Sequence, residues 1–473
     1  MGVSYVHPAL YTKRIPGKGL GVFSKAKLPP DTTIGIEAGG EIIMLAEARA
    51  RKRRGDDHAH QVAPDFYWAP KGKRDMTTLD FINHCCDPNV GLFGGTTWVV
   101  RKSISPHKDE LGNEYATFDF DPKYKIECRC GAQNCRGRLT GNDWKKLGLQ
   151  IRHWGFFTPF KQLEIERRMR KNHLWVKDQK LYYLDLYKPT APHWHEILGG
   201  EKGILVNRRS RFQHIQIFMT AAYGLMLALD GYPQAAIGDE WIYHEALTWV
   251  ALLCHPNPEV VVILGGGDGL LLKQILRDPR VKKVILIDID ADVVKFIQKF
   301  PEFWSDAHLD PRVTIVNADA LQYLRDMDFL ADIFFSDLTD PTESSLSTDL
   351  MSTEYFGLIK DRMRDEKSLM MFQGGEGAEN AFEDHMSGRR KIEEIFPYLQ
   401  SFFFHVPSFS TEWSGIIAGL EPLPNFGDAA TAKRLFRTHP ELSATFRYLT
   451  PRTLAGMFAY SRSIAHAIGT PGT

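Results

Sequence analysis

The stretch from Val261 to Asp290 limits the fold of this chain more than any other. It begins with an apolar, β-branched run that breaks into glycines, and a short amphipathic run follows. This pattern predicts a buried parallel strand that turns sharply into a helix, with a loop whose backbone can approach a ligand closely. A second strand, Val281 to Ile287, ends at Asp288, where nucleotide-binding αβ units place an acid to accept hydrogen bonds from ribose hydroxyls. The glycines of the loop are Gly265, Gly266, Gly267 and Gly269. An adenosine-type ligand is therefore expected at this edge.

The length and charge of the chain narrow its class. With 473 residues, two or three domains are expected. Lys plus Arg (58) equals Asp plus Glu (58), so the chain has no net positive charge that would attract nucleic acid or an anionic membrane. No apolar run reaches the length of a membrane span, and the first residues carry no signal-peptide core. We expect a soluble intracellular protein, cytoplasmic, with the nucleus as the alternative compartment.

The cysteines are concentrated in a region of short extended runs. Residues 1–145 show little helical periodicity, and five of the six cysteines lie between Cys85 and Cys135. In an intracellular chain of this size such clustering favours metal ligation over disulfides, with unpaired buried cysteines as the alternative. Cys128, Cys130 and Cys135 bring three thiolates onto one tight loop, and a tetrahedral zinc ion needs a fourth soft ligand.

Three motifs in this region resemble one family. They are Gly17 to Phe23, Asp80 to Asn89, and Gly112 to Phe120 followed by Glu127 to Gly137. In order and spacing they resemble the SET-domain lysine methyltransferases with a post-SET segment. The resemblance implies a β-rich fold in which Cys86 completes a zinc site with Cys128, Cys130 and Cys135. It also implies that Lys18, Gly19, Asn83 and His84 border an S-adenosylmethionine pocket, although His84 could equally be a structural histidine.

One position departs from the SET pattern. In the family the third motif usually ends in a tyrosine whose hydroxyl lies beside the methyl group that is being transferred. Here that position is Phe120. A phenyl ring cannot donate a hydrogen bond to the incoming amine. Either another hydroxyl substitutes, with Tyr67 as a candidate, or the region binds a lysine-containing protein or peptide without methylating it.

The second half of the chain predicts two further domains after a connecting segment at 146–173. Residues 174–235 alternate apolar and polar positions and contain an Asp230-Gly231 turn, which predicts a small antiparallel sheet. In residues 236–420 several predicted strands have a polar residue at the C-terminal end. This pattern predicts a doubly wound α/β (Rossmann-like) sheet, with those side chains in one crevice. A helical extension follows at 421–473. The polar residues at the strand ends are Asp288, Asn317, Asp319, Asp337, Asp340 and Gln373.

Residues 174–420 resemble the spermidine synthase family of aminopropyltransferases. The matching pieces include Gln213, Asp230-Gly231, Asp239 to Glu245, Gly265 to Gly269, Asp288 to Asp290, Asn317 to Asp319, Asp337 to Pro341, and Gln373-Gly374. The resemblance implies decarboxylated S-adenosylmethionine as the aminopropyl donor and an oligomer of identical chains. It assigns Asp288 to the ribose, Asp319 to the adenine, and Asp268 with Gln213 to the amino tail. It assigns Asp337 and Tyr243 to deprotonation of the attacking amine and Asp340 to the amine channel, and it places Gly265, Gly267 and His244 around the donor.

The expected chemistry explains why carboxylates gather here. A primary amine attacks the carbon beside a sulfonium, so the site must hold two cations and accept one proton. S-adenosylmethionine carries a carboxylate that Asp268 and Asp337 would repel, since two like charges about 4 Å apart at an effective dielectric of about 20 cost roughly 4 kcal/mol. The alternative is that Asp268 caps the following helix and Asp337 is a structural acid.

The acceptor side departs from spermidine-forming relatives. Such enzymes have a late Pro-Thr-Tyr segment, and the counterpart here is Pro407-Ser408-Phe409 followed by Trp413. The leading hypothesis is a SET-like module fused to an aminopropyltransferase that acts on a diamine or polyamine. In one alternative the two modules modify one amine substrate, by aminopropyl and methyl transfer. In another the SET-like module only binds peptides.

Overall fold

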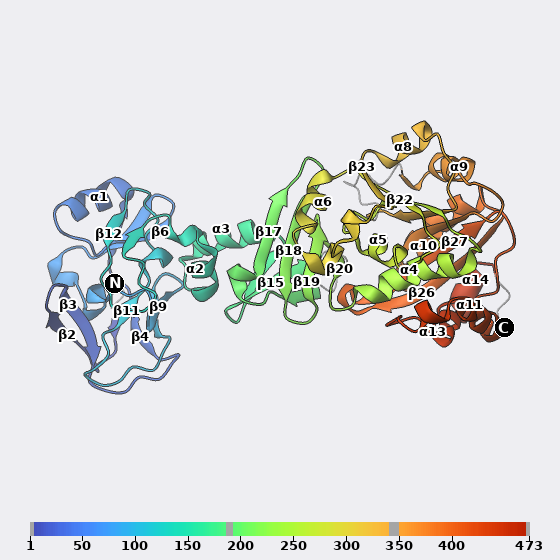
Figure 1. The fold of residues 1–473 in the computed structure, drawn as a ribbon. Helices are drawn as coiled ribbons and strands as arrows, with labels where there is room; N and C mark the ends of the chain where they lie inside the picture. Colours follow the sequence, from blue (N-terminus) through green and yellow to red (C-terminus); the bar gives the residue numbers. More distant parts are fainter. Residues whose placement is uncertain (1–3, 186–192, 340–349, 470–473) are drawn as a thin grey trace. The chain divides into compact units, whose positions relative to one another are not determined.

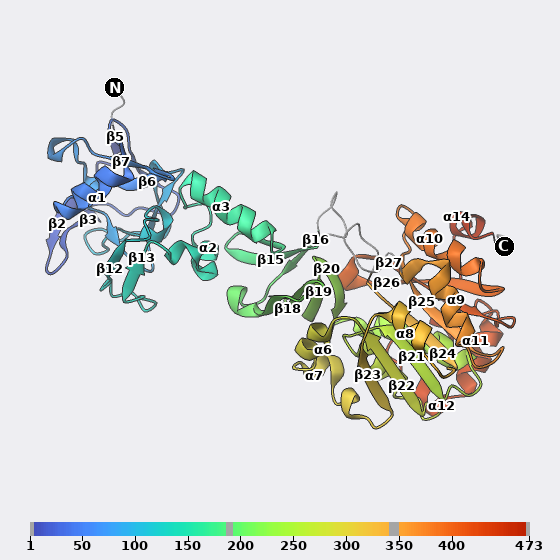
Figure 2. The ribbon, with the colours of Figure 1, turned by 90° about the horizontal axis from the view of Figure 1, so that it is seen from above.

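The computed structural model divides the chain into two compact units (Figures 1 and 2). It describes residues 4–185, 193–339 and 350–469. The first unit comprises Met1–Leu184 with Gly199–Glu201, and the second comprises Asp185–Leu198 with Lys202–Thr473. None of the helices in these described ranges is both long and apolar enough to cross a membrane.

The first unit consists of small sheets and short helices. A four-stranded sheet in the order β1-β4-β10-β9 packs Val22, Ile34 and Trp98 into its core. The hairpin β2–β3, the sheet β5-β7-β6, the parallel pair β8–β11 and the hairpins β12–β13 and β14–β15 complete the strands. The strands are β1 (Tyr5–Val6), β2 (Leu10–Ile15), β3 (Gly19–Ser24), β4 (Thr33–Ile36), β5 (Glu41–Met44), β6 (His60–Ala63), β7 (Phe66–Ala69), β8 (Asn83–His84), β9 (Val90–Phe93), β10 (Thr97–Val100), β11 (Gly112–Asn113), β12 (Lys125–Glu127), β13 (Arg138–Thr140), β14 (Leu174–Lys177) and β15 (Lys180–Asp185).

Helices are few in this unit. They are α1 (Leu45–Arg53), α2 (Leu147–Arg152) and α3 (Pro159–Arg170). Helix α3 lies within residues 146–173, the segment expected to connect the domains. The β-rich prediction for this part of the chain is confirmed.

The second unit opens with the antiparallel sheet β17-β18-β19-β20. Asp230 and Gly231 both have positive φ, 49° and 99°, and form the two-residue turn between β19 and β20 that the sequence predicts. The strands of that sheet are β17 (Ile204–Arg209), β18 (His214–Thr220), β19 (Gly224–Leu229) and β20 (Tyr232–Ala236), and β16 (His193–Glu196) precedes them outside it.

A seven-stranded sheet forms the core of the second unit, in the order β23-β22-β21-β24-β25-β27-β26. The first five strands are parallel, β27 pairs antiparallel with β25, and β26 pairs antiparallel with β27. The strand order reverses between β21 and β24, and ligands of open α/β sheets bind at such a point. The strands are β21 (Val260–Gly265), β22 (Lys283–Asp288), β23 (Val313–Asn317), β24 (Ile333–Asp337), β25 (Leu369–Glu376), β26 (Tyr398–Val406) and β27 (Thr411–Gly419).

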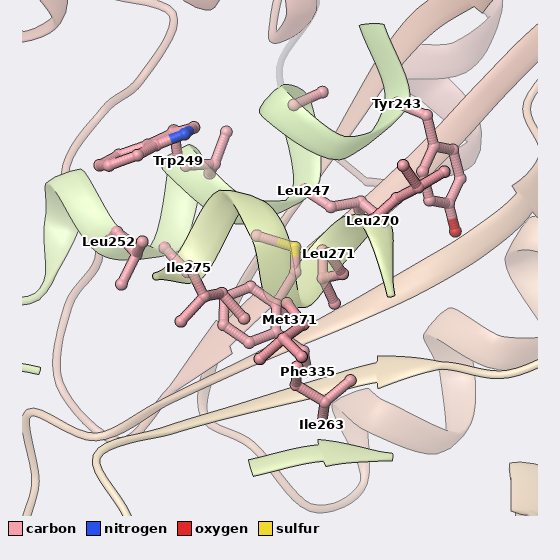
Figure 3. Close-up of a cluster of buried hydrophobic side chains, with 14 of the residues drawn as sticks. Tyr243, Leu247, Trp249, Leu252, Ile263, Leu270, Leu271, Ile275, Phe335 and Met371 are labelled. Carbon is pink, nitrogen blue, oxygen red and sulfur yellow. The ribbon is translucent and has the colours of Figure 1, made fainter. Parts of the chain in front are cut away.

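Helices cover both faces of this sheet. Helices α4, α5, α11 and α13 pack on one face, and α8, α9 and α10 pack on the other. In Figure 3, Leu247 and Trp249 of α4 and Ile275 of α5 lie above Ile263 and Phe335 of the sheet. The helices are α4 (Glu240–Cys254), α5 (Leu270–Ile275), α6 (Ala291–Ile297), α7 (Pro301–Trp304), α8 (Ala320–Asp326), α9 (Thr353–Asp361), α10 (Phe382–Glu393), α11 (Ala429–Arg437), α12 (Pro440–Ser443), α13 (Pro451–Met457) and α14 (Arg462–Ala467).

One buried carboxylate ties the C-terminal segment to α4. Glu245, 1% exposed, accepts hydrogen bonds from the backbone amides of Arg447 (2.8 and 3.1 Å), Tyr448 (2.8 Å) and Leu449 (3.1 Å). A buried charge requires such compensation. Helix α11 lies in the segment 421–473 that the sequence predicts to be helical, and it packs in the same core as α4.

Candidate active site

A cavity lies where the parallel strands of the second unit end. Its walls come from the loop after β21, the ends of β22 and β24, the start of α8, helix α4 and the small antiparallel sheet. Among its lining residues are Gln213, Asp230, Tyr243, Gly265, Gly266, Gly267, Asp268, Asp288, Asp319, Asp337, Gln373, Phe409 and Trp413. The polar residues predicted at the strand ends, apart from Asn317 and Asp340, therefore meet in one crevice. Asp340 lies outside the described residues.

The glycine loop shapes one wall of this cavity. Gly265, Gly266 and Gly269 have φ of 86°, 68° and 78°, a left-handed conformation that other residues rarely adopt. A Cβ on Gly267 would lie 2.4 Å from an Asp288 carboxylate oxygen, so no larger residue fits beside that acid. The loop thus turns sharply and leaves the Asp288 side chain room at the cavity.

Asp337 is held in a defined orientation. The hydroxyl of Tyr243 donates a hydrogen bond of 2.6 Å to Asp337 Oδ1. Burial and the nearby charge of Asp268 raise the pKa of Asp337 to about 6, although His244 and the Tyr243 hydrogen bond act in the opposite direction. A carboxyl group with a pKa close to neutral is suited to exchanging a proton with a substrate.

Asp268 and His244 form a pair of titratable side chains near Asp337. Burial raises the pKa of Asp268, while His244 and the amide of Leu270 (2.9 Å) lower it. For His244, burial by itself would lower the pKa, but the nearby acids Glu240, Asp268 and Asp337 raise it to about 9. His244 Nδ1 lies 2.7 Å from the Glu240 carbonyl and 3.1 Å from its carboxylate. The imidazole is therefore a buried cation near two cavity acids, and it is not itself among the cavity-lining residues.

The other predicted donor residues lie around the cavity with clear local roles. Asp288 accepts from the amide of Asp290 (2.8 Å), and burial raises its pKa to about 6. Asp319 caps helix α8 through the amide of Gln322 (2.8 Å). Gln213 donates to the carboxylate of Asp290 at 2.9 Å.

Asp290 and Gln373 differ from what the sequence suggested. In the sequence Asp290 stands out only as part of the motif Asp288 to Asp290, whereas in the structure its buried side chain accepts hydrogen bonds from Gln213 and Ser210 (2.6 Å) and caps α6. Gln373 is not at a strand end, because β25 continues to Glu376 through a shift of register with β27. Its side chain still lines the cavity and donates to the Leu338 carbonyl at 2.8 Å.

Aromatic rings close the remaining side. Phe409 and Trp413 line the cavity with ring centroids 5.0 Å apart, and Tyr243 lies 6.3 Å from Phe409. Phe409 belongs to the short 3-10 turn η8 (Pro407–Phe409), which follows β26. The wall is apolar at Phe409, which stands where the Pro-Thr-Tyr segment has its tyrosine.

In the first unit, two of the residues predicted to border an S-adenosylmethionine pocket, Lys18 and Asn83, meet at Glu110, whereas His84 lies with the cysteines. Lys18 Nζ lies 3.2 Å from one carboxylate oxygen of Glu110, and Asn83 Nδ2 donates to the other at 2.8 Å. Gly19 has a φ of 88° and open space around it. Glu110 was not identified from the sequence because it lies outside all three motifs.

The cysteines also come together. Cys86 Sγ lies 3.8 Å from Cys128 Sγ, and Cys128 Sγ lies 3.6 Å from Cys135 Sγ. Ligand atoms of His84, Cys86, Cys128 and Cys130 all lie within 4.8 Å of one another. The donor set of thiolates and imidazole fits zinc.

A separate acidic cavity lies in the first unit. Glu37, Asp57, Asp80 and Asp119 line it, together with Tyr115 and Tyr124. Burial raises the pKa of Glu37 to about 8 and that of Asp119 to about 6. Phe120 is not among its lining residues; its buried ring packs against Trp144 and Phe160.

Comparison with known proteins identifies the second unit. The family description "Spermine/spermidine synthase domain" matches residues 240–423, and "Spermidine synthase tetramerisation domain" matches residues 202–236. Polyamine aminopropyltransferase 1 of Hyperthermus butylicus is 34% identical over 237 residues, which cover 48% of this chain and 78% of that protein. The chain belongs to the polyamine aminopropyltransferase family.

Further relatives agree with this membership. Thermospermine synthase ACAULIS5 of Arabidopsis thaliana is 30% identical over 50% of this chain and 75% of that protein. A crystal structure of spermidine synthase in complex with the transition state analogue AdoDATO has the same fold, with a TM-score of 0.55 and 24% identity over 61% of this chain and 94% of that one. The family description "SET domain" matches residues 19–115 in the first unit. The chain is therefore a fusion of a SET domain and a polyamine aminopropyltransferase.

Proposed function

We propose that the second unit transfers the aminopropyl group of decarboxylated S-adenosylmethionine to a primary amine of a diamine or polyamine. The observation that carries this proposal is Asp337, a half-buried carboxylate oriented by Tyr243 at the strand end beside the glycine loop. Such a group can accept the proton that the attacking amine must lose.

The residues around the cavity divide the work. The amine nitrogen forms a bond to the methylene carbon beside the sulfonium, the carbon–sulfur bond breaks, and its electron pair stays on sulfur as a neutral thioether. Asp337 orients the amine and takes its proton, while Tyr243 holds the carboxylate in place. On the donor side, Asp288 would bind the ribose, Asp319 the adenine, and Asp268 with Gln213 the amino tail.

The charge of the cavity selects the donor. Asp268 and Asp337 both line it, and the pKa of each is raised because burial and, for Asp337, the other acid disfavour the anion. A third carboxylate in this environment would add repulsion, at about 4 kcal/mol for two charges about 4 Å apart. S-adenosylmethionine is excluded on this basis, and its decarboxylated form is accepted.

Mass spectrometry tests the reaction directly. Purified protein is incubated with either sulfonium and a panel of diamines, polyamines and lysine peptides. A mass gain of one aminopropyl unit, seen only with the decarboxylated donor, is expected on one class of amine. The absence of aminopropyl product from the whole panel would refute the proposal.

We also propose a structural zinc ion in the first unit, held by Cys86, Cys128, Cys130 and Cys135. His84 Nδ1 accepts a hydrogen bond from the Tyr115 amide (3.3 Å), so its Nε2 carries the proton and points it at Cys86 Sγ, 3.2 Å away. The imidazole then supports a thiolate ligand instead of coordinating the metal.

Replacing Cys128 with serine is expected to remove one equivalent of zinc and to lower the melting temperature of the first unit, because a structural zinc site contributes folding energy. Elemental analysis after gel filtration and calorimetry measure the two effects. His84→Gln is the matched control, which keeps the metal if all four ligands are thiolates. Loss of zinc from His84→Gln but not from Cys135→Ser would instead place the imidazole in the ligand set.

A second candidate function is methyl transfer from S-adenosylmethionine to a cationic amine in the SET domain. The acidic cavity favours a protonated lysine or polyamine, because Asp57, Asp80 and Asp119 line it beside Glu37, whose raised pKa of about 8 leaves it largely neutral near pH 7. Tyr124 lines the same cavity, and its buried hydroxyl has no hydrogen-bond partner among the described residues. This hydroxyl would replace the one that Phe120 lacks. Tyr67 fits less well, because its hydroxyl contacts Gln61 (3.4 Å) and it lines a different cavity.

Replacing Tyr124 with phenylalanine is expected to lower methyl transfer by about 100-fold, the effect typical of one positioned proton-transfer or hydrogen-bonding group. Labelled S-adenosylmethionine with lysine peptides and polyamines gives the rate, and Tyr67→Phe should retain it. If the wild-type protein methylates neither class but binds lysine peptides, the SET domain is a binding module.

The match of residues 202–236 to a spermidine synthase tetramerisation domain supports a homo-oligomer. Light scattering of the purified chain measures its state. A monomer at micromolar concentration would contradict this proposal.

A further inference from the structure

Three ligand-type side chains meet in the second unit away from the donor cavity. They are Asp185, His193 and His195, and one ligand atom from each lies within 4.8 Å of the others. None of them lines the active-site cavity or belongs to a motif of either resemblance. Asp185 and His195 are buried, at 2% and 4% exposure, and His193 is half-buried.

Local structure explains why the two imidazoles lie together. His193 and His195 are two residues apart on β16, and alternate residues of a strand project from the same face. Their ring centroids are 4.5 Å apart with the rings nearly perpendicular. Asp185 is the last residue of β15, and its carboxylate lies near the two imidazoles of β16.

The spacing suits a bound ion better than a direct contact. His195 Nε2 lies 3.9 Å from Asp185 Oδ2, which is too long for a hydrogen bond. Ligands of one tetrahedral zinc ion, with bonds of about 2.0 Å, lie about 3.3 Å apart. A small side-chain rotation closes this difference. Two imidazoles and one carboxylate also form a donor set that zinc and related divalent ions prefer.

The surroundings connect this cluster to the active-site wall. The Ser410 hydroxyl lies 2.9 Å from His193 Nδ1, and Ser410 directly follows the turn η8 that carries Phe409. The same turn is held by Asp239, which accepts from the Ser408 amide (2.7 Å), and by Tyr223, which donates to the Pro407 carbonyl (3.2 Å). The His195 ring lies 6.1 Å from that of Tyr223.

We propose that Asp185, His193 and His195 bind a divalent transition-metal ion of the zinc class, with a fourth position left for water. The site is distinct from the cysteine cluster and independent of the transfer chemistry. An ion here fixes β16 next to Ser410 and so braces the turn that presents Phe409 to the cavity.

Metal stoichiometry tests the proposal on the full chain. Protein loaded with Zn²⁺ and passed through gel filtration should hold two equivalents, one at the cysteines and one at this site. His193→Gln should hold one, whereas His466→Gln, a change at an exposed histidine on α14, should hold two. His193 is chosen because it is half-buried, so the variant is expected to fold.

Co²⁺ spectra separate the two sites. In the Cys128→Ser background, added Co²⁺ should give visible d–d absorption without the near-ultraviolet band of thiolate ligation, and His193→Gln should abolish it. The proposal is overturned if wild-type protein holds metal only at the cysteines, or if His193→Gln changes neither the stoichiometry nor the Co²⁺ spectrum.

Discussion

Replacing Asp337 with asparagine is expected to lower kcat for aminopropyl transfer by about 1,000-fold. The amide has nearly the same shape and can still contact Tyr243, but it cannot accept the amine proton. A positioned general base typically contributes 10²- to 10⁴-fold. Product formation measured by mass spectrometry at saturating donor and acceptor gives the ratio directly.

Two controls separate the base from its support. Tyr243→Phe removes only the hydrogen bond of 2.6 Å and should cost about tenfold. The pH profile of kcat/KM should fall on the acid side with an apparent pKa near 6, because the pKa of Asp337 is raised to about 6 and its protonated form cannot accept a proton. This value belongs to the coupled Asp268–Asp337 pair. An unchanged rate in Asp337→Asn would remove Asp337 from the mechanism.

Replacing Glu245 with alanine is expected to lower the free energy of unfolding of the second unit by about 3 to 5 kcal/mol. The change leaves the backbone amides of Arg447, Tyr448 and Leu449 without the buried carboxylate that accepts their hydrogen bonds. Loss of one partner of a buried charged network costs about this much. Urea denaturation followed through the transition of this unit gives the size of the effect.

Hydrogen exchange shows whether the loss is local. The amides of residues 447–449 should exchange much faster in Glu245→Ala, while Glu245→Gln, which keeps one acceptor oxygen, should show a smaller change. Glu366→Ala, at an exposed position, is the matched control and should leave both measurements unaltered. Unchanged protection in Glu245→Ala would mean that the segment is held by its apolar packing alone.

The sequence was most informative where local chemistry and tertiary position agree. The run from Val261 into the glycine loop predicted β21 and the turn into α5, because an apolar run that ends in several glycines has few other folds available. Asp230-Gly231 predicted its turn for the same reason, since both residues tolerate positive φ. Asp288 and Asp337 could be assigned to one crevice because parallel strands end at a common edge.

The contacts between individual side chains could not be predicted from the sequence. Asp290 and Asp288 are both acids at one strand end, and only the structure shows that Asp290 turns away to hold Gln213 while Asp288 lines the cavity. Phe120 occupies a motif position, but its ring packs in the core beside Trp144, which the motif does not reveal. Tyr124 and Glu110 lie outside the motifs that the resemblance supplied, so nothing marked them in advance.

Helix α4 carries Tyr243 and Glu245 two residues apart, one serving the cavity and the other the C-terminal segment. For a laboratory that wishes to express the transferase by itself, this arrangement decides where the fragment must stop. A piece that ends at residue 423, where the match to the family ends, would leave Glu245 without its three amide donors and expose the apolar surface of α4 that packs in one core with α11 and α13. The shortest useful fragment extends past Met457 and Phe458, which complete that core.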